Sequence, residues 1–158
     1  MISAGSEEVS SAASGGLRLF QSWQFWAGLS AVFAALTAIF GKMGVAGLNS
    51  NFATFVRTVV ILVIVGAVVW WRGEWQRLSG HGLAAVGFLI ASGIATGLSW
   101  LCYYRALQLG PASKVAPVDK LSVILVIGLG VVFLGEPLSW RLAIGGGLIL
   151  AGVVLVAL

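Results

Sequence analysis

The residues of this chain that could take part in chemistry are a few charged side chains within very apolar sequence. In GPASKVAPVDKLS, residues 110–122, Lys114, Asp119 and Lys120 occur together with two prolines, and runs of valine, leucine and glycine lie on either side. A carboxylate changes its charge when it takes up a proton, whereas the guanidinium of Arg57 keeps its charge. Asp119 is therefore the residue that we expect to carry a proton, and the other charged side chains offer binding of a charged solute.

The composition places these charges in a membrane protein. Of the 158 residues, 59% are hydrophobic and 9% are charged, whereas a soluble domain has roughly 25% charged residues. Seven tryptophans against two tyrosines favour anchoring at the membrane interface. The net charge of +4 comes from basic residues scattered among apolar spans, which does not indicate nucleic-acid binding. We expect a multi-pass protein of the inner (plasma) membrane, in contact with membrane lipids.

Long uncharged stretches predict an all-α integral membrane protein with five transmembrane helices. A hydrocarbon core of about 30 Å needs roughly 20 helical residues, and the second helix reaches this length only if it includes Arg57. The connections are short, so consecutive helices are expected to be antiparallel, with no room for a soluble catalytic domain. Residues 1–22 read as a disordered tail. The expected helices are about 23–43, 51–71, 83–109, 114–134 and 140–158.

The charged residues near the helix ends gather on the side of the membrane opposite the N-terminus. Ionisable groups at membrane depth cost roughly 2.5–3.5 kcal/mol each on insertion scales and usually face protein or a water-filled cavity. We interpret the set as a polar vestibule whose excess positive charge suits an anionic or zwitterionic solute. Alternatively, the lysines and arginines nearest the helix ends extend into the headgroups. The set is Lys42, Arg57, Arg105, Lys114, Asp119 and Lys120.

Two interpretations of Asp119 remain open. If a helix begins at Pro117, Asp119 is its third residue, where a carboxylate meets the positive helix end. If the helix begins at Ser113, Pro117 kinks it and leaves a carbonyl unpaired, and broken helices are typical of transporter sites. In neither case does a basic residue lie three or four places away on the same helix. We therefore predict a partner from another helix, with Arg57 and Lys42 nearest in depth.

Aromatic and small residues share one face of the third helix. Gly93, Gly97, Trp100 and Tyr104 recur at three- and four-residue spacing, which places them together on a helix. The glycines permit close helix contact, or serve plain packing. Trp100, Tyr103 and Tyr104 either line a substrate path or belong to an interfacial belt.

Motifs of enzymes, cofactor sites and metal sites are missing from the sequence. There is no phosphate-binding G-x-x-x-x-G-K-[ST] loop, which argues against ATP hydrolysis. The single histidine, His81, leaves no base for a serine nucleophile, and the single cysteine, Cys102, cannot form a cysteine metal site. We therefore expect a protein that is not an enzyme and that uses no cofactor or metal.

Several segments resemble a known transporter family. TGLSWLCYYRALQLGPASKVAPVDKLSVI and FLGEPLSWRLAIGGGLILAGVVLV are similar to helices three to five of the EamA domain in the drug/metabolite transporter superfamily, and AVFAALTAIFGKMGV and Arg57 fit the same domain. The resemblance covers about residues 23–158. It implies transport of a metabolite, with substrates ranging from amino acids and nucleotide precursors to drugs. Most members carry two inverted repeats, whereas this chain is similar to the single-domain members. Glu136 matches the family's G-E after helix four, and its place at a membrane edge suggests a structural role.

The first functional hypothesis is a secondary transporter for a small organic metabolite or drug-like solute. Substrate would bind near Arg57, Asp119 and Lys120, with Trp100 and Tyr104 along the path, and Lys42 and Arg105 belong to the same candidate set. The alternative is a non-transporting membrane subunit, or a component that helps to flip a lipid-linked sugar.

The distribution of basic residues predicts pairing with an inverted copy. Orientation follows the bias of Lys and Arg near helix ends, and here the two sides are nearly balanced, as dual insertion needs. We expect an antiparallel homodimer, and the alternative is one fixed topology with a different partner. The N-terminal side has Arg18, Arg72, Arg77 and Arg141; the opposite side has Lys42, Arg105 and Lys114, plus Arg57 and Lys120 if deeper residues count.

Overall fold

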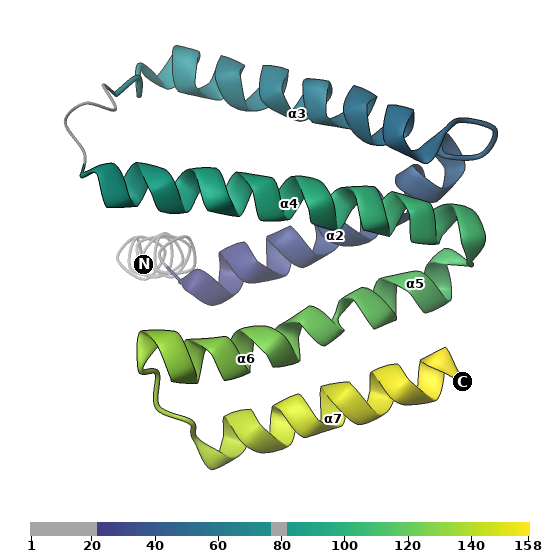
Figure 1. Ribbon diagram of the computed structural model, residues 1–158, viewed down its shortest axis with the longest axis vertical. Helices are drawn as coiled ribbons and strands as arrows, with labels where there is room; N and C mark the ends of the chain where they lie inside the picture. The colour runs from purple at the N-terminus through teal and green to yellow at the C-terminus, as the bar shows by residue number, and fades with distance from the viewer. Residues whose placement is uncertain (1–21, 77–81) are drawn as a thin grey trace, which may run out of the picture. The chain divides into compact units, whose positions relative to one another are not determined.

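The computed structural model describes residues 22–76 and 82–158, and all regular structure in these ranges is helical. Five segments are long and apolar enough to cross a membrane, one of them formed by α5 and α6 together (Ala112–Leu134). This confirms the expected all-α architecture with five spans. Residues 1–21, on which the expected disordered tail falls, lie outside the described residues. The helices are α2 (Trp23–Gly44), α3 (Ser50–Arg72), α4 (Leu83–Leu109), α5 (Ala112–Asp119), α6 (Leu121–Leu134) and α7 (Trp140–Ala157) (Figure 1).

The chain divides after Phe40 into two compact units, and α2 continues across this boundary. In the first unit, Met1–Phe40, the described residues form most of α2, and large apolar side chains such as Trp23 and Phe33 are exposed along it. The second unit, Gly41–Leu158, holds the last turn of α2 and all the other helices. All of the candidate site residues lie in the second unit.

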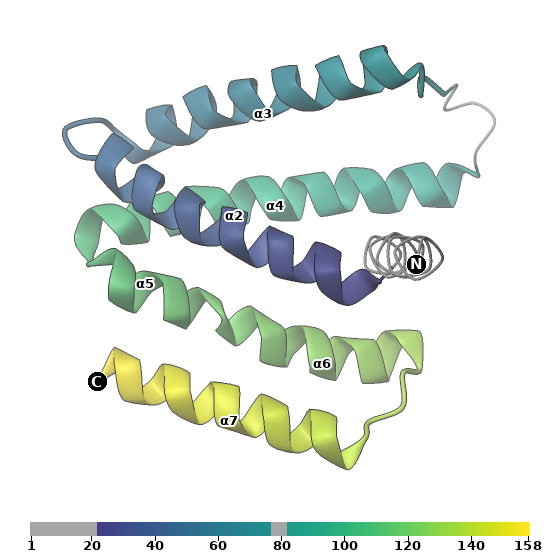
Figure 2. The same ribbon diagram turned by 180° about the vertical axis from the view of Figure 1, so that it is seen from behind.

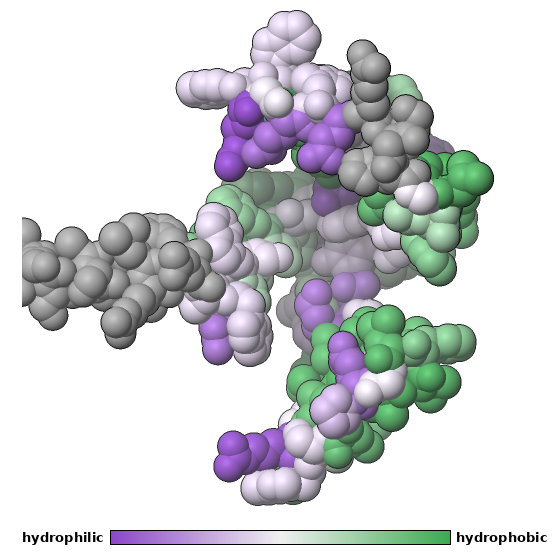
Figure 3. All heavy atoms as spheres, turned by 90° about the vertical axis from the view of Figure 1, so that its left-hand side faces the viewer, coloured by the Kyte–Doolittle hydropathy of each residue, from purple (hydrophilic) through white to green (hydrophobic). Residues whose placement is uncertain are grey.

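Within the second unit, neighbouring helices run in opposite directions. Figures 1 and 2 show α3 beside α4, and α7 beside the α5–α6 segment. The buried cluster is small and consists of Val45, Ala53, Tyr104 and the fully buried Leu107. Most other large apolar side chains are exposed, as expected for helices that face hydrocarbon. Figure 3 looks onto the end with the α3–α4 and α6–α7 connections, where hydrophilic residues gather while hydrophobic residues cover α6 and α7.

Helix ends follow local sequence signals. The Asn49 side chain accepts a hydrogen bond from the Asn51 backbone N–H at 2.9 Å, which caps the start of α3. The Ser139 hydroxyl accepts one from Leu142 at 3.2 Å at the start of α7. Gly73 closes α3 with φ +65°, a left-handed conformation that glycine adopts without strain.

Glu136 has a structural role at the C-terminal end of α6. Gly135 has φ +66°, and the Glu136 backbone N–H donates to the Gly130 carbonyl at 3.2 Å. The Glu136 carboxylate also folds over Gly130, where an added Cβ would lie 2.9 Å from its Oε2 atom. Glu136 and the buried Gly130 therefore fit together, and a larger residue at position 130 would displace the carboxylate.

The membrane-length segment that contains Asp119 is broken. Pro117 lies inside α5, which begins at Ala112, so the interpretation in which a helix starts at Pro117 is wrong. Proline has no N–H to offer the carbonyl of residue 113, which weakens the helix one turn before the break. The Lys120 N–H bonds instead to the Pro117 carbonyl at 2.9 Å, a tighter i→i+3 turn, and α6 resumes at Leu121. Asp119 is thus the last residue of α5, directly before the break.

Candidate functional site

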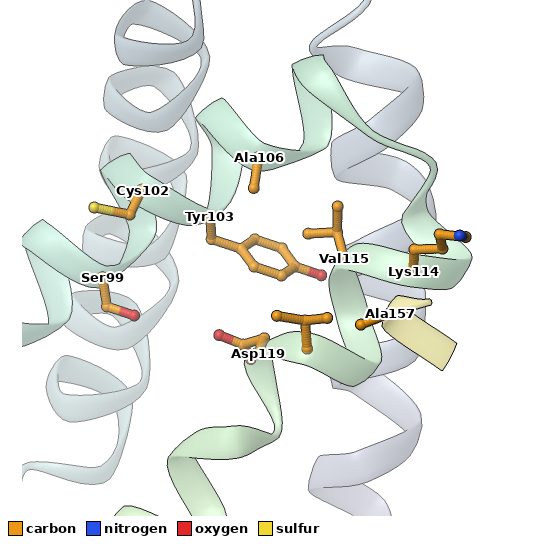
Figure 4. A pocket seen from close by; sticks show the side chains of 9 residues that line it. Ser99, Cys102, Tyr103, Ala106, Lys114, Val115, Asp119 and Ala157 are labelled. Atoms are coloured by element: carbon orange, nitrogen blue, oxygen red, sulfur yellow. The ribbon is translucent and has the colours of Figure 1, made fainter. Parts of the chain in front are cut away.

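A cavity of about 380 Å³ lies between α4 and α5, with the last residue of α7 at its edge. This volume is in the range of small-molecule sites. The ring of Tyr103 projects into the cavity from α4, and Asp119 and Val115 face it from α5 (Figure 4). The lining residues are Ser99, Cys102, Tyr103 and Ala106 of α4, Lys114, Val115, Val118 and Asp119 of α5, and Ala157 of α7.

Among the residues that the structure describes, Asp119 is the only carboxylate that lines this cavity. Its Oδ2 atom lies 3.4 Å from the Lys120 ammonium, so the prediction of a partner from another helix is wrong. Adjacent residues meet here because the chain turns between α5 and α6. The two side chains are 38% and 55% exposed, respectively, and such exposed pairs contribute little. Asp119 is therefore half-buried at the cavity wall and only loosely paired.

Arg57 lies on aromatic rings. Its guanidinium carbon is 3.3 Å from the centroid of the Trp100 ring and 5.8 Å from that of Tyr104. A cation over an aromatic face gains about 0.5–1 kcal/mol at exposed sites and about 2 or more when desolvated. This contact offsets part of the cost of holding a permanent charge at membrane depth. The structure thus brings together three sequence-predicted residues, Arg57, Trp100 and Tyr104, in one cluster.

Lys42 ties the last turn of α2 to the end of α4. Its ammonium donates to the carbonyl oxygens of Leu107, at 2.5 Å, and Gly110, at 2.9 Å. The last carbonyls of a helix have no partner within it, and a positive group there also suits the helix dipole. Lys42 does not line the cavity, but it holds the turn that joins the two helices forming the cavity.

Arg105 takes part in a second tie at this end of α4. It donates to the Gln108 side-chain oxygen at 3.1 Å, and the Gln108 amide donates to the Leu48 carbonyl at 2.6 Å. Arg105 is itself exposed. The predicted charged set is therefore divided into residues at the cavity, residues on the aromatic cluster and residues that secure the end of α4.

Tyr103 connects the cavity with the aromatic cluster. Its ring meets that of Trp100 edge-on, with centroids 5.4 Å apart, and it projects into the cavity that Asp119 also lines. The sequence signal was available, because Ser99, Cys102, Tyr103 and Ala106 recur at helical spacing. They form the face of α4 next to the one that carries Gly93, Gly97, Trp100 and Tyr104.

The glycine face of α4 has no close neighbour at its two glycines. A Cβ added at Gly93 or Gly97 would meet nothing within 4 Å among the described residues. Gly97 lines a shallow groove between α3 and α4, together with Thr54 and Thr58. The small residues thus leave space instead of tightening a helix pair in this chain.

The described residues form five segments long and apolar enough to cross a membrane, as in a multi-pass membrane protein. Comparison with known proteins identifies the family. The model of the EamA-like transporter family matches residues 21–158. The chain belongs to this family, which supports a function in membrane transport.

Two curated relatives were found. An "uncharacterized transporter in cobO 3'region" of Sinorhizobium sp. is 56% identical over 137 residues, which cover 87% of this chain and 97% of the relative. A "probable 4-amino-4-deoxy-L-arabinose-phosphoundecaprenol flippase subunit ArnF" of Shewanella sediminis is 39% identical over 93 residues, 56% of this chain and 63% of the relative. No solved structure matches the chain.

The contacts of Lys42 predict a loss of stability when its charge is removed. In Lys42→Met, the carbonyls of Leu107 and Gly110 lose a charged donor, which we expect to lower the free energy of unfolding by roughly 1.5–3 kcal/mol. Lys120→Met is the matched control, because its exposed ion pair is worth at most about 1 kcal/mol. Thermal unfolding of both purified variants in one neutral detergent measures the difference. Equal melting temperatures would show that Lys42 does not secure α4.

Proposed function

We propose that this protein is a secondary transporter of the inner membrane that moves a small organic metabolite or drug-like solute, driven by a proton or solute gradient. The observation that carries this proposal is a cavity of about 380 Å³ beside the break in a membrane-length helix, with Asp119 at the break. Broken helices at substrate sites are a recurring feature of secondary transporters. Membership of a transporter family supports the same function.

The proposed path includes the aromatic cluster next to the cavity. The Tyr103 ring lies 5.4 Å from that of Trp100 and 6.5 Å from that of Tyr104, and it shares the cavity with Asp119, which has Lys120 beside it. Basic residues predominate in the charged set, and this favours anionic or zwitterionic solutes over cations. Lys42 and Arg105 would contribute to this positive field, while their hydrogen bonds secure the end of α4.

The single cysteine offers a direct test of the cavity as the substrate site. Cys102 is exposed and lines the cavity, with its sulfur pointing away from the Tyr103 ring (Figure 4), so a bulky maleimide on its thiol should obstruct the cavity at its edge and reduce transport strongly. Cys102→Ser should transport normally and resist the reagent. The measurement is uptake of a metabolite mixture into proteoliposomes, analysed by mass spectrometry. Full transport by the completely labelled wild-type protein would move the substrate site elsewhere.

Asp119 is proposed to carry the coupling proton. Asp119→Asn keeps the shape of the side chain but cannot release a proton, so uptake driven by a pH gradient should fall to the uncoupled background. Exchange of substrate without a gradient should persist at saturating substrate concentration, and Asp119→Glu should restore part of the coupling. Both rates are measured in the same proteoliposomes. Wild-type coupling in Asp119→Asn would remove Asp119 from this role.

We also propose that the working unit is an antiparallel homodimer. Alternating access requires an exit on each side, and an inverted second copy would supply one. Space around the glycines supports this, since added Cβ atoms at Gly93, Gly97, Gly145 and Gly152 would meet nothing within 4 Å among the described residues. Small residues let helices of two chains approach closely in lipid.

Dual insertion can be tested by labelling a cysteine in the connection between α3 and α4. A cysteine at Glu74, in a Cys102→Ser background, should react with an impermeant maleimide in both intact cells and inverted vesicles. Each preparation should label about half of the protein if the Lys and Arg balance leaves orientation undecided. A reaction confined to one preparation would establish a single topology and contradict the inverted dimer.

A second candidate function is a subunit that helps to flip a lipid-linked sugar. The name of the Shewanella relative favours it, as does the predominance of apolar lining residues such as Val115, Val118 and Ala157. Thermal stabilisation by a panel of soluble metabolites separates the two, because a ligand of the folded state raises its stability. A response to soluble solutes supports the transporter, and a response confined to polyprenyl-phosphate sugars supports the flippase subunit.

A further inference from the structure

Two side chains of opposite charge line the α4–α5 cavity. Lys114 and Asp119 both belong to α5 and are five residues apart, which separates their backbones by about 7.5 Å along the helix axis. Figure 4 shows Asp119 beside the Tyr103 ring and Lys114 at the far edge of the cavity, with its ammonium directed outward from that edge. The cavity therefore has a positive edge and a negative edge.

Both charges are available to a ligand. The Lys114 ammonium has no hydrogen-bond or ion-pair partner within residues 22–76 and 82–158. The Asp119 carboxylate has only the loose, exposed contact with Lys120, which leaves its second oxygen unoccupied by any described side chain. In contrast, Lys42 and Arg105 already donate to protein oxygens, and neither lines the cavity.

The wall between the two charges is mainly apolar. Val115 and Val118 follow the same side of α5, Ala106 faces them from α4, and the Tyr103 ring lies among them. Apolar surface gains about 25 cal/mol per Å² on leaving water. An apolar body would thus supply binding energy in the middle of the cavity, and the charged ends would set its orientation.

From this arrangement we infer that the cavity binds a small zwitterion whose ammonium and anionic groups lie at opposite ends of an apolar chain. The ammonium pairs with Asp119 and the anionic group with Lys114. A zwitterion whose two charged groups are attached to the same carbon can reach only one of the two edges, and it leaves the other unpaired. This inference rests on the proposed transport function and names the substrate class for the same cavity.

Two isomers provide a sharp test. In 6-aminohexanoate the charges are at the two chain ends, and in norleucine, which has the same atoms, they are adjacent. We expect the wild-type protein in neutral detergent to bind 6-aminohexanoate roughly ten- to hundred-fold more tightly than norleucine, as the loss of one charged contact predicts. Isothermal titration calorimetry measures both affinities. Equal affinities, or no binding of 6-aminohexanoate, would overturn the inference.

Variants and single-charge probes assign the two ends. Lys114→Met should weaken binding of 6-aminohexanoate about ten-fold or more and leave hexylamine unchanged, whereas Lys114→Arg should largely restore it. Asp119→Asn should weaken 6-aminohexanoate and hexylamine but not hexanoate. Arg141→Met, outside the cavity, is the control and should change none of these affinities. An unchanged affinity of Lys114→Met for 6-aminohexanoate would contradict the role of Lys114.

The experiments distinguish a failure of the proposed transport function from a failure of the zwitterion inference. If 6-aminohexanoate binds with the expected preference but proteoliposomes move no solute, the cavity assignment stands and the transport function does not. If the protein transports other solutes with no preference for separated charges, transport stands and this inference is wrong.

Discussion

The structure depends on the need to satisfy backbone hydrogen bonds where water is absent. In hydrocarbon each unpaired N–H or C=O costs several kcal/mol, so a spanning chain must be helical almost throughout. Five segments are helical over a length that can cross a membrane. One of them, Ala112–Leu134, is interrupted between Pro117 and Leu121. Irregular backbone at membrane depth is tolerated where it is buried in protein or lines a cavity, and here the break adjoins the cavity that contains Asp119. Because the membrane enforces helical structure, an interruption of a helix indicates a cavity or a protein contact at that point.

Charges in this protein are divided between holding the fold and facing the cavity. Lys42 is bound to two carbonyls at the end of α4, and Arg57 rests on Trp100. Both arrangements offset the cost of a charge within an apolar segment by giving it a protein partner. Lys114 and Asp119 have fewer protein partners, and they are the charged residues that line the cavity. Membrane depth alone does not distinguish these two uses, because it does not reveal which groups already have partners.

The small buried core bears on the working unit. Membrane helices associate through close packing and not through a hydrophobic driving force. In this chain, however, Leu107 is the only large side chain that is fully buried among the described residues. A domain with so little internal packing and several open glycine faces has surface left for further helix contacts. In the proposed antiparallel homodimer, a second copy would cover part of this surface.

Much of the fold was determined by the sequence itself. Long uncharged runs require helices, and the spacing of Lys42, Arg57 and Asp119 along them indicated one charged side. The TGLSWLCYYRALQLGPASKVAPVDKLSVI segment pointed to the family that the match over residues 21–158 establishes. Helical periodicity is local, so one sequence suffices to read it.

The start of α5 and the partners of the charges were decided only in three dimensions. Whether Pro117 begins a helix or interrupts one depends on the turn before it, and whether Lys42 meets a carboxylate or a carbonyl depends on which helix end lies opposite. Tyr103 shows the same limit: its spacing was visible, but only the packing of α5 against α4 makes its face the wall of a cavity.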